Sequence, residues 1–241
     1  MQKSSMGMLP ALNEFAAGDP PELGRLTSER ASIVFGGVYE NLITSDSARI
    51  STVVLVCSAS KKEGATTIAS GLAIAASQRR GGETLLMDCN YHNPNVLKVF
   101  GKGRGSTGER ERLLSDLVEK HGYAGTEVSS TPLAGLTIMG TAHGLKNHVQ
   151  ALEPPRFRNM LDELTKIFTF VVIDGPPVNL HSESTLLGSQ VDRILLVVHA
   201  GVTRMPVASK AVERLSAGGI QPQVILNRRD FPIPDAVYRR L

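Results

Sequence analysis

Residues 51–76 read STVVLVCSASKKEGATTIASGLAIAA, and this stretch decides the fold. It opens with the short, β-branched apolar run Val53–Val56, which is typical of a buried parallel strand. After Gly64, apolar residues such as Ile68 and Leu72 return at helical spacing. The stretch therefore predicts a strand, a loop and a helix. Such a loop presents backbone N–H groups and a helix N-terminus, which suit an anion such as a phosphate.

Strand and helix patterns alternate along the rest of the chain. Further strands are predicted at Thr84–Asp88, Leu136–Met139, Phe170–Asp174, Arg193–His199 and Gln223–Leu226. Helices are predicted at Ser32–Thr44, Arg110–His121, Pro154–Ile167 and Pro206–Ala217. This alternation predicts an α/β fold, a doubly wound and mostly parallel sheet flanked by helices. A ligand then binds above the carboxyl ends of the strands, so the informative loops follow Val56, Asp88, Asp174 and Leu226.

Composition limits the number of domains and the classes of partner. We expect residues 1–27 to form a flexible N-terminal arm and residues 28–241 a single domain. The net charge is only +3, Trp is absent and no dense Lys/Arg block occurs, so no nucleic-acid partner is expected. Cys57 and Cys89 each end a predicted strand and are expected to be reduced core residues. No apolar run approaches the roughly 20 residues of a transmembrane helix, so no transmembrane segment is expected.

The loop after the first strand resembles the Walker A loop of P-loop ATPases. The usual loop ends in Gly-Lys-Ser/Thr, whose lysine contacts the β- and γ-phosphates and whose hydroxyl binds magnesium. Here Ala65 stands in the place of the lysine, whereas Thr66 keeps the hydroxyl. Removing one comparable transition-state donor costs on the order of 100- to 1000-fold in rate.

Other strand ends extend the resemblance. Thr169–Val178 (TFVVIDGPPV) is similar to a Walker B strand, and Leu85–Phe100 (LLMDCNYHNPNVLKVF) is similar to a second acidic motif. Arg193–Arg204 and Val224–Arg228 match as well. From about Ser28 to its end, the chain resembles the cytoplasmic kinase domain of bacterial tyrosine kinases that accompany capsule and exopolysaccharide chain-length regulators. The resemblance implies a P-loop NTPase-like fold that binds ATP or ADP with Mg²⁺.

The departures from that family concentrate at chemically active positions. In the acidic motif Asp88 remains, but the second aspartate is Asn90 and the arginine is His92. The family's Glu…Arg…Arg oligomerisation pattern is replaced by Ile33, Gly36 and Tyr39. The tyrosine-rich phosphoacceptor tail is reduced to Tyr238. These losses imply weak or absent nucleotide binding, and a monomer or dimer in place of the family's ring of subunits.

The candidate site is transferred residue by residue from the resemblance. Asp88 and Asp174 are the candidate catalytic residues, in vestigial form, and with Thr66 they are the candidate Mg²⁺ ligands. The candidate nucleotide-binding residues are Lys61, Lys62, Glu63, Gly64, Ala65, Thr66, Thr67 and Asn227. Two alternatives stay open: Asn227 either meets the adenine base or forms a turn, and Thr66 either binds metal or caps its helix. His92 and His181 are expected to be solvated.

Two hypotheses of function follow. The first is a catalytically impaired, cytoplasmic regulator or scaffold of capsule or exopolysaccharide chain-length control and export. It would reach the inner membrane through a partner, a membrane-embedded co-polymerase. The alternative is an active ATP-dependent tyrosine autokinase or ATPase in which Lys61 or Lys62 supplies the missing charge. A membrane-cycling positioning ATPase is a third idea, but the tail FPIPDAVYRRL is too short and Pro-broken for a membrane-binding helix.

Overall fold

Strand β1 (Thr52–Ser58) lies at the centre of the sheet, because five of its apolar side chains are buried there. A computed structural model of the chain describes residues 21–44, 51–80, 83–101, 108–122, 126–140 and 148–228. The other strands of this described part are β2 (Thr84–Asp88), β3 (Glu127–Ser130), β4 (Leu136–Gly140), β5 (Phe170–Asp174), β6 (Arg193–His199) and β7 (Gln223–Asn227). Their order in the sheet is β3-β4-β2-β5-β1-β6-β7.

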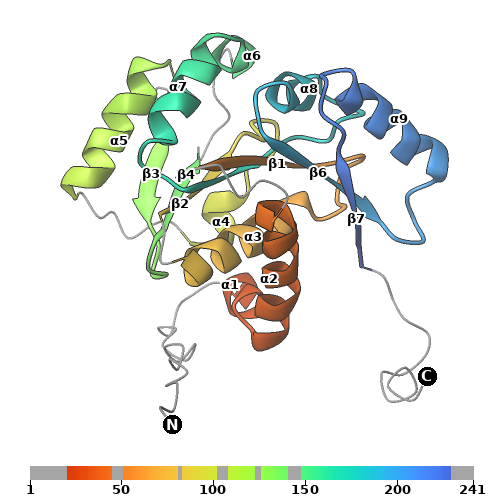
Figure 1. Cartoon of the computed structure of the whole chain (residues 1–241), viewed down its shortest axis with the longest axis horizontal. Helices are drawn as coiled ribbons and strands as arrows, with labels where there is room; N and C mark the ends of the chain where they lie inside the picture. Colours follow the sequence, from red (N-terminus) through yellow and green to blue (C-terminus); the bar gives the residue numbers. More distant parts are fainter. Residues whose placement is uncertain are drawn as a thin grey trace.

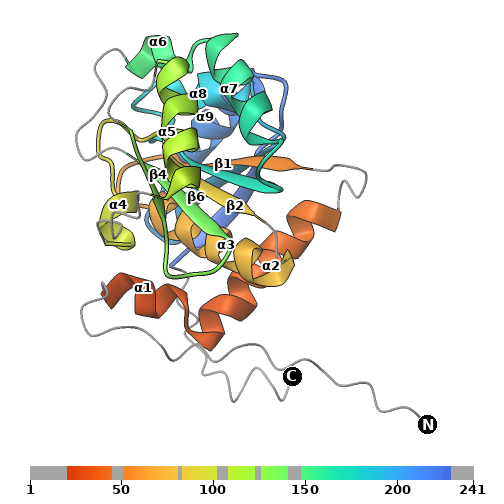
Figure 2. The ribbon, with the colours of Figure 1, turned by 90° about the vertical axis from the view of Figure 1, so that its left-hand side faces the viewer.

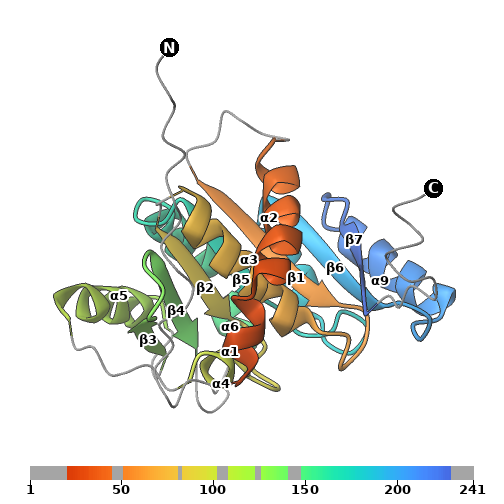
Figure 3. The same cartoon turned by 90° about the horizontal axis from the view of Figure 1, so that it is seen from below.

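All neighbouring strands run parallel except β3 and β4, which pair antiparallel. Figure 3 shows β3 and β7 at opposite edges of the sheet. Because the parallel strands share one direction, their carboxyl ends meet at one edge. The register places Val56 and Asp88 beside Asp174, on either side of β5. The predicted doubly wound, mostly parallel sheet is therefore confirmed.

Helices cover both faces of the sheet (Figures 1 and 2). The described helices on one face are α1 (Pro21–Leu26), α2 (Glu29–Thr44), α3 (Ala65–Arg80) and α4 (Val96–Val99). Those on the other face are α5 (Glu109–Lys120), α6 (His148–Leu152), α7 (Arg156–Leu164), α8 (Glu183–Gly188) and α9 (Met205–Ser216). Alternate residues of the central strands point to opposite faces, so each face has its own apolar core.

The N-terminal segment differs from the expectation where it is described. Residues 21–26 form helix α1, and Leu23 and Leu26 are buried against the core below the sheet. Burial of two leucines stabilises this segment, so residues 21–27 belong to the folded body and not to an irregular arm. Residues 1–20 of the expected arm lie outside the described residues.

Helix α2 packs closely on α3 and on the sheet. The Tyr39 ring meets Phe170 of β5 edge-on, with 5.1 Å between ring centroids. The Phe35 ring occupies the space that a Cβ atom on Gly71 would need, at 2.3 Å. Tyr39, which stands where the resemblance leads us to expect an arginine, is 1% exposed. This position of α2 therefore contributes to the core of the chain.

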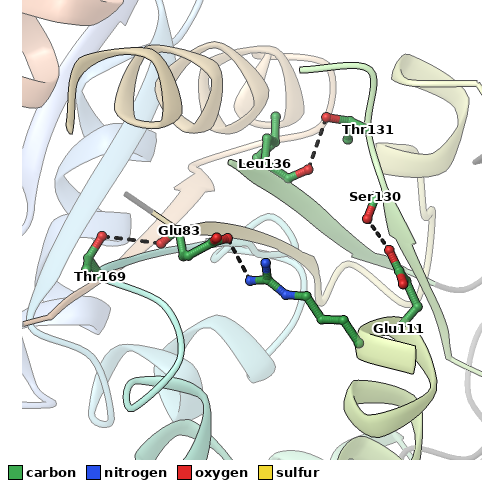
Figure 4. Close-up of polar contacts among 7 residues, drawn as sticks. Glu83, Glu111, Ser130, Thr131, Leu136 and Thr169 are labelled. Carbon is green, nitrogen blue, oxygen red and sulfur yellow. Dashed lines mark hydrogen bonds and ion pairs between the residues drawn. The ribbon is translucent and has the colours of Figure 1, made fainter. Parts of the chain in front are cut away.

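Side-chain contacts fasten the β3 edge of the sheet (Figure 4). Nη2 of Arg110, at the start of α5, donates to Oε2 of Glu83 at 2.6 Å, beside the beginning of β2. The hydroxyl of Thr169 donates to the carbonyl oxygen of the same Glu83 at 3.3 Å. The hydroxyl of Ser130 donates to the carboxylate of Glu111 in the first turn of α5. The Ser130–Glu111 contact joins β3, a strand that the sequence pattern did not predict, to α5. The other two contacts join α5 and the start of β5 to the beginning of β2.

Candidate functional site

A cleft of about 620 Å³ lies at the carboxyl edge of the parallel strands. It is lined by the loop after β1, by the loops after β2 and β5, and by Arg228 beyond β7. The cationic side chains of Lys61, Lys62 and Arg228 face it, and all three residues are exposed. Converging cations beside a helix N-terminus favour an anionic ligand.

The loop after β1 contains two residues with positive φ angles. Lys62 has a φ of 65° and Gly64 a φ of 95°, so both adopt the left-handed conformation. This conformation is common for glycine but costs an ordinary residue about 1–2 kcal/mol. Lys62 is not a glycine, and it nevertheless takes up a glycine-like backbone.

Glu63 holds this loop from beneath. Its carboxylate is buried, accepts the N–H of Ser60 at 2.8 Å, and accepts the hydroxyl of Thr203 from the loop before α9. Nδ2 of Asn227, at the end of β7, donates to the carbonyl oxygen of Glu63 at 2.8 Å. The N–H of Arg228 donates to Oδ1 of Asn227 at 2.9 Å. Both ends of the Asn227 amide are thus engaged within the protein, and each can still make a second hydrogen bond, so both alternatives for this residue stay open.

Asp174 lies below the cleft floor, next to Thr66. The Thr66 hydroxyl donates to Oδ2 of Asp174 at 2.6 Å, whereas the buried Oδ1 accepts no hydrogen bond from any residue that the structure describes. Burial raises the pKa of Asp174 well above its usual range, and the nearby Asp88 carboxylate raises it further. A buried, unsatisfied carboxylate oxygen is costly unless a proton or a cation neutralises it.

The carboxylate of Asp88 is used by its own loop. It accepts the backbone N–H groups of Asn90 at 3.1 Å, Asn95 at 2.8 Å and Val96 at 2.9 Å. Burial raises the pKa of Asp88 to about 6, against the lowering effect of these three hydrogen bonds. Asp88 thus fixes the connection between β2 and α4, and most of its acceptor capacity is already filled.

Nucleotide and Mg²⁺ fit this site in part. The loop N–H groups with Lys61 and Lys62 would hold phosphates, and Thr66 with Oδ1 of Asp174 would hold a hydrated Mg²⁺. The fit fails at Ala65, whose methyl side chain offers no charge at the helix entry. The metal, when bound, would neutralise charge on the phosphates.

The structure brings most of the predicted residues together. The loop residues Lys61, Lys62, Glu63, Gly64, Ala65 and Thr66 line the cleft. Thr67 is exposed on the first turn of α3, and Asp88, Asp174 and Asn227 support the walls from behind. Lining residues that sequence reasoning missed are Asn93, Asn95, Gly175, Pro177 and Arg228. They follow the strand ends, so the rule for parallel sheets could have found them.

The two histidines at the rim are not independent solvated side chains. The imidazole rings of His92 and His181 stack with centroids 3.7 Å apart and an interplanar angle of 18°. Nε2 of His92 lies 2.7 Å from Oε1 of Glu183, the first residue of α8. His92 is exposed as expected, but it also stacks on His181 and contacts Glu183. No spacing pattern predicts this contact, because the two histidines come from loops 89 residues apart in the chain.

Comparison with known proteins bears on this arrangement. The tyrosine-protein kinase CpsD of Streptococcus pneumoniae serotype 4 is 27% identical over 182 residues, which cover 75% of this chain and 78% of CpsD. The crystal structure of the VpsO kinase domain is 28% identical, covers 83% of this chain and 95% of that one, and has a TM-score of 0.67. The kinase domain of the Escherichia coli tyrosine kinase ETK is 18% identical and has a TM-score of 0.71. The match covers 93% of this chain and 88% of the ETK chain.

A more distant structure shares the fold alone. It is the septum site-determining protein MinD of Pyrococcus horikoshii in complex with Mg-ADP, which is 19% identical and has a TM-score of 0.56. The match covers 79% of this chain and 76% of the MinD chain. No protein-family model matches the chain. The relatives confirm the resemblance to bacterial tyrosine kinases and the P-loop ATPase-like fold. Among the helices that the structure describes, none has the length and apolar character needed to cross a membrane.

Proposed function

We propose that this chain is a catalytically impaired, tyrosine-kinase-like regulator or scaffold of capsule or exopolysaccharide chain-length control and export. The observation that carries the proposal is Ala65, the first residue of α3, at the end of a loop in which Lys62 and Gly64 both have left-handed φ angles. A lysine at this position would place a positive charge on the transferring phosphate. Without it, the cleft can hold an anion but lacks the donor that accelerates transfer.

The state of the two aspartates supports the same proposal. Asp174 is buried with a raised pKa, and Asp88 spends its carboxylate on three backbone N–H groups. Both groups then serve the architecture of the strand ends more than they serve chemistry. The proposed protein is cytoplasmic and peripheral to the inner membrane, where it docks on a membrane-embedded co-polymerase as a monomer or dimer. A partner-dependent membrane fraction, lost when the co-polymerase is deleted from the cell, tests the docking.

The alternative function is an active ATP-dependent tyrosine autokinase or ATPase. The observation in its favour is that Lys61 and Lys62 line the same cleft as Thr66 and are exposed. A flexible ammonium group could then reach a terminal phosphate from the side of the loop. Neither lysine occupies the helix entry, so we prefer the impaired protein.

A phosphate-release assay with ATP and Mg²⁺ on the full chain separates the two functions. We expect no turnover above that of Asp174→Ala, and we expect Ala65→Lys to raise turnover by on the order of 100-fold or more. Binding of ATP with Mg²⁺ to the same chains is measured in parallel by isothermal titration calorimetry. Turnover by the unchanged chain that is abolished by Asp174→Ala, and also by Lys61→Ala or Lys62→Ala, would overturn the proposal and establish the alternative.

A further inference from the structure

Two histidines and one glutamate converge at the rim of the cleft. His92 comes from the loop after β2, and His181 and Glu183 come from the connection between β5 and α8. One ligand atom of each residue lies within 4.8 Å of the others. The ring stack and the 2.7 Å contact between His92 and Glu183 bring these side chains together from separate loops.

We propose that His92, His181 and Glu183 form a binding site for a divalent transition-metal ion of the Zn²⁺ class. Two imidazole nitrogens and one carboxylate oxygen are a ligand set that Zn²⁺ accepts in open, three-ligand sites. Hard ions such as Mg²⁺ prefer oxygen ligands and would bind elsewhere. The site is therefore chemically distinct from the Thr66 and Asp174 position. It does not depend on the proposed function.

Binding the ion needs a rearrangement of the two rings. An imidazole nitrogen coordinates a metal in the plane of its ring, so the stacked rings, 3.7 Å apart and 18° from parallel, must turn toward a common point. At Zn–N distances of about 2.0–2.1 Å, tetrahedral ligand atoms are roughly 3.3 Å apart, so the 2.7 Å contact between His92 and Glu183 would also open slightly. The His92 side chain is 35% exposed and can rotate, whereas Glu183 is 6% exposed and serves as a fixed anchor.

The position of the ion would connect it to the cleft. His92 and His181 both line the cleft together with Lys61 and Lys62. Three protein ligands leave a fourth coordination position on the open side. This position would hold water or an oxygen atom of an anion bound in the cleft. The ion would thereby restore positive charge to a site that has an alanine at the usual lysine position.

Metal binding is measured on the full chain after chelator treatment and dialysis, by competition for Zn²⁺ against a chromophoric chelator. We expect one Zn²⁺ per chain, no competition by excess Mg²⁺, and a Co²⁺ complex with the intense visible absorption of a four-coordinate site. His92→Ala, His181→Ala and Glu183→Gln should each weaken Zn²⁺ binding at least tenfold. His92→Ala is the decisive variant, because an exposed loop side chain can be removed without disturbing the core.

His121→Ala is the matched control. Nε2 of His121 also contacts a glutamate, Oε1 of Glu163 at 3.3 Å, but among the described residues the pair belongs to no three-ligand cluster. Its Zn²⁺ affinity should equal that of the unchanged chain. Thermal melts of each variant establish that it is folded. The proposal is overturned if the unchanged chain binds no stoichiometric Zn²⁺, or if folded His92→Ala and His181→Ala both bind it as tightly as the control.

Discussion

Replacing Gly64 with alanine tests the way the phosphate-binding loop is held. Gly64 has a φ of 95°, and a Cβ atom there would lie 2.3 Å from Nδ2 of Asn227. That amide nitrogen donates to the carbonyl oxygen of Glu63 at 2.8 Å. The substitution therefore adds backbone strain and displaces the side chain that joins β7 to the loop.

The expected cost has two parts. An ordinary residue in the left-handed conformation loses about 1–2 kcal/mol, and the displaced hydrogen bond is worth about 1 kcal/mol. Gly64→Ala should thus lower the free energy of unfolding by about 2–3 kcal/mol. In an Asn227→Ala background the clash is already relieved, so the same change should cost about 1 kcal/mol less. Urea denaturation of the four chains of this double-mutant cycle measures both values.

Gly37→Ala provides a control with the opposite sign. Gly37 is exposed on α2, and no described atom lies within 4 Å of a Cβ atom placed on it. Alanine in a helix interior is favoured over glycine by up to about 1 kcal/mol, so this variant should be as stable as the unchanged chain or more stable. Equal destabilisation by the two substitutions would refute the argument. An additive cycle would refute the proposed clash with Asn227.

Three further predictions concern buried groups. Burial raises the pKa of Asp174 and of Asp88, so the folded chain binds protons that the unfolded chain releases, and stability should fall as pH rises from about 4 through 6. Asp174→Asn should lessen that fall. In urea titrations at pH 8, the free energy of unfolding of this variant should exceed that of the unchanged chain by about 1 kcal/mol or more. The prediction is contradicted if the stability of the unchanged chain rises between about pH 4 and pH 6. Glu63→Gln should cost about 1–3 kcal/mol in the same assay, because only one acceptor oxygen remains for Ser60 and Thr203, while exposed Glu109→Gln should change little. Leu23→Ala should lower the free energy of unfolding by about 2–5 kcal/mol, because Leu23 is fully buried. Leu180→Ala is the control, since Leu180 is exposed and its loss should have a negligible effect. An equally small effect of Leu23→Ala would support a loose N-terminal arm.

Periodicity located the main elements well where it was strong. The strands Thr84–Asp88 and Arg193–His199 have the bounds that their apolar runs predicted. Helices α4, α6 and α8 have only four to six residues, too few for a helical period to show. The polar strand Glu127–Ser130 lies at the sheet edge and is held by α5, so its own residues carry little signal.

The sequence by itself determined the α/β fold, the loop after β1 and the alanine at position 65 of that loop, because local spacing and residue type settle these properties. The tertiary structure alone decided which strands are neighbours. That order places Asp88 beside Asp174, directs the Glu63 carboxylate inward, and joins His92 to Glu183. Contacts between loops that are distant in the chain depend on packing of the whole sheet, and no local pattern encodes them.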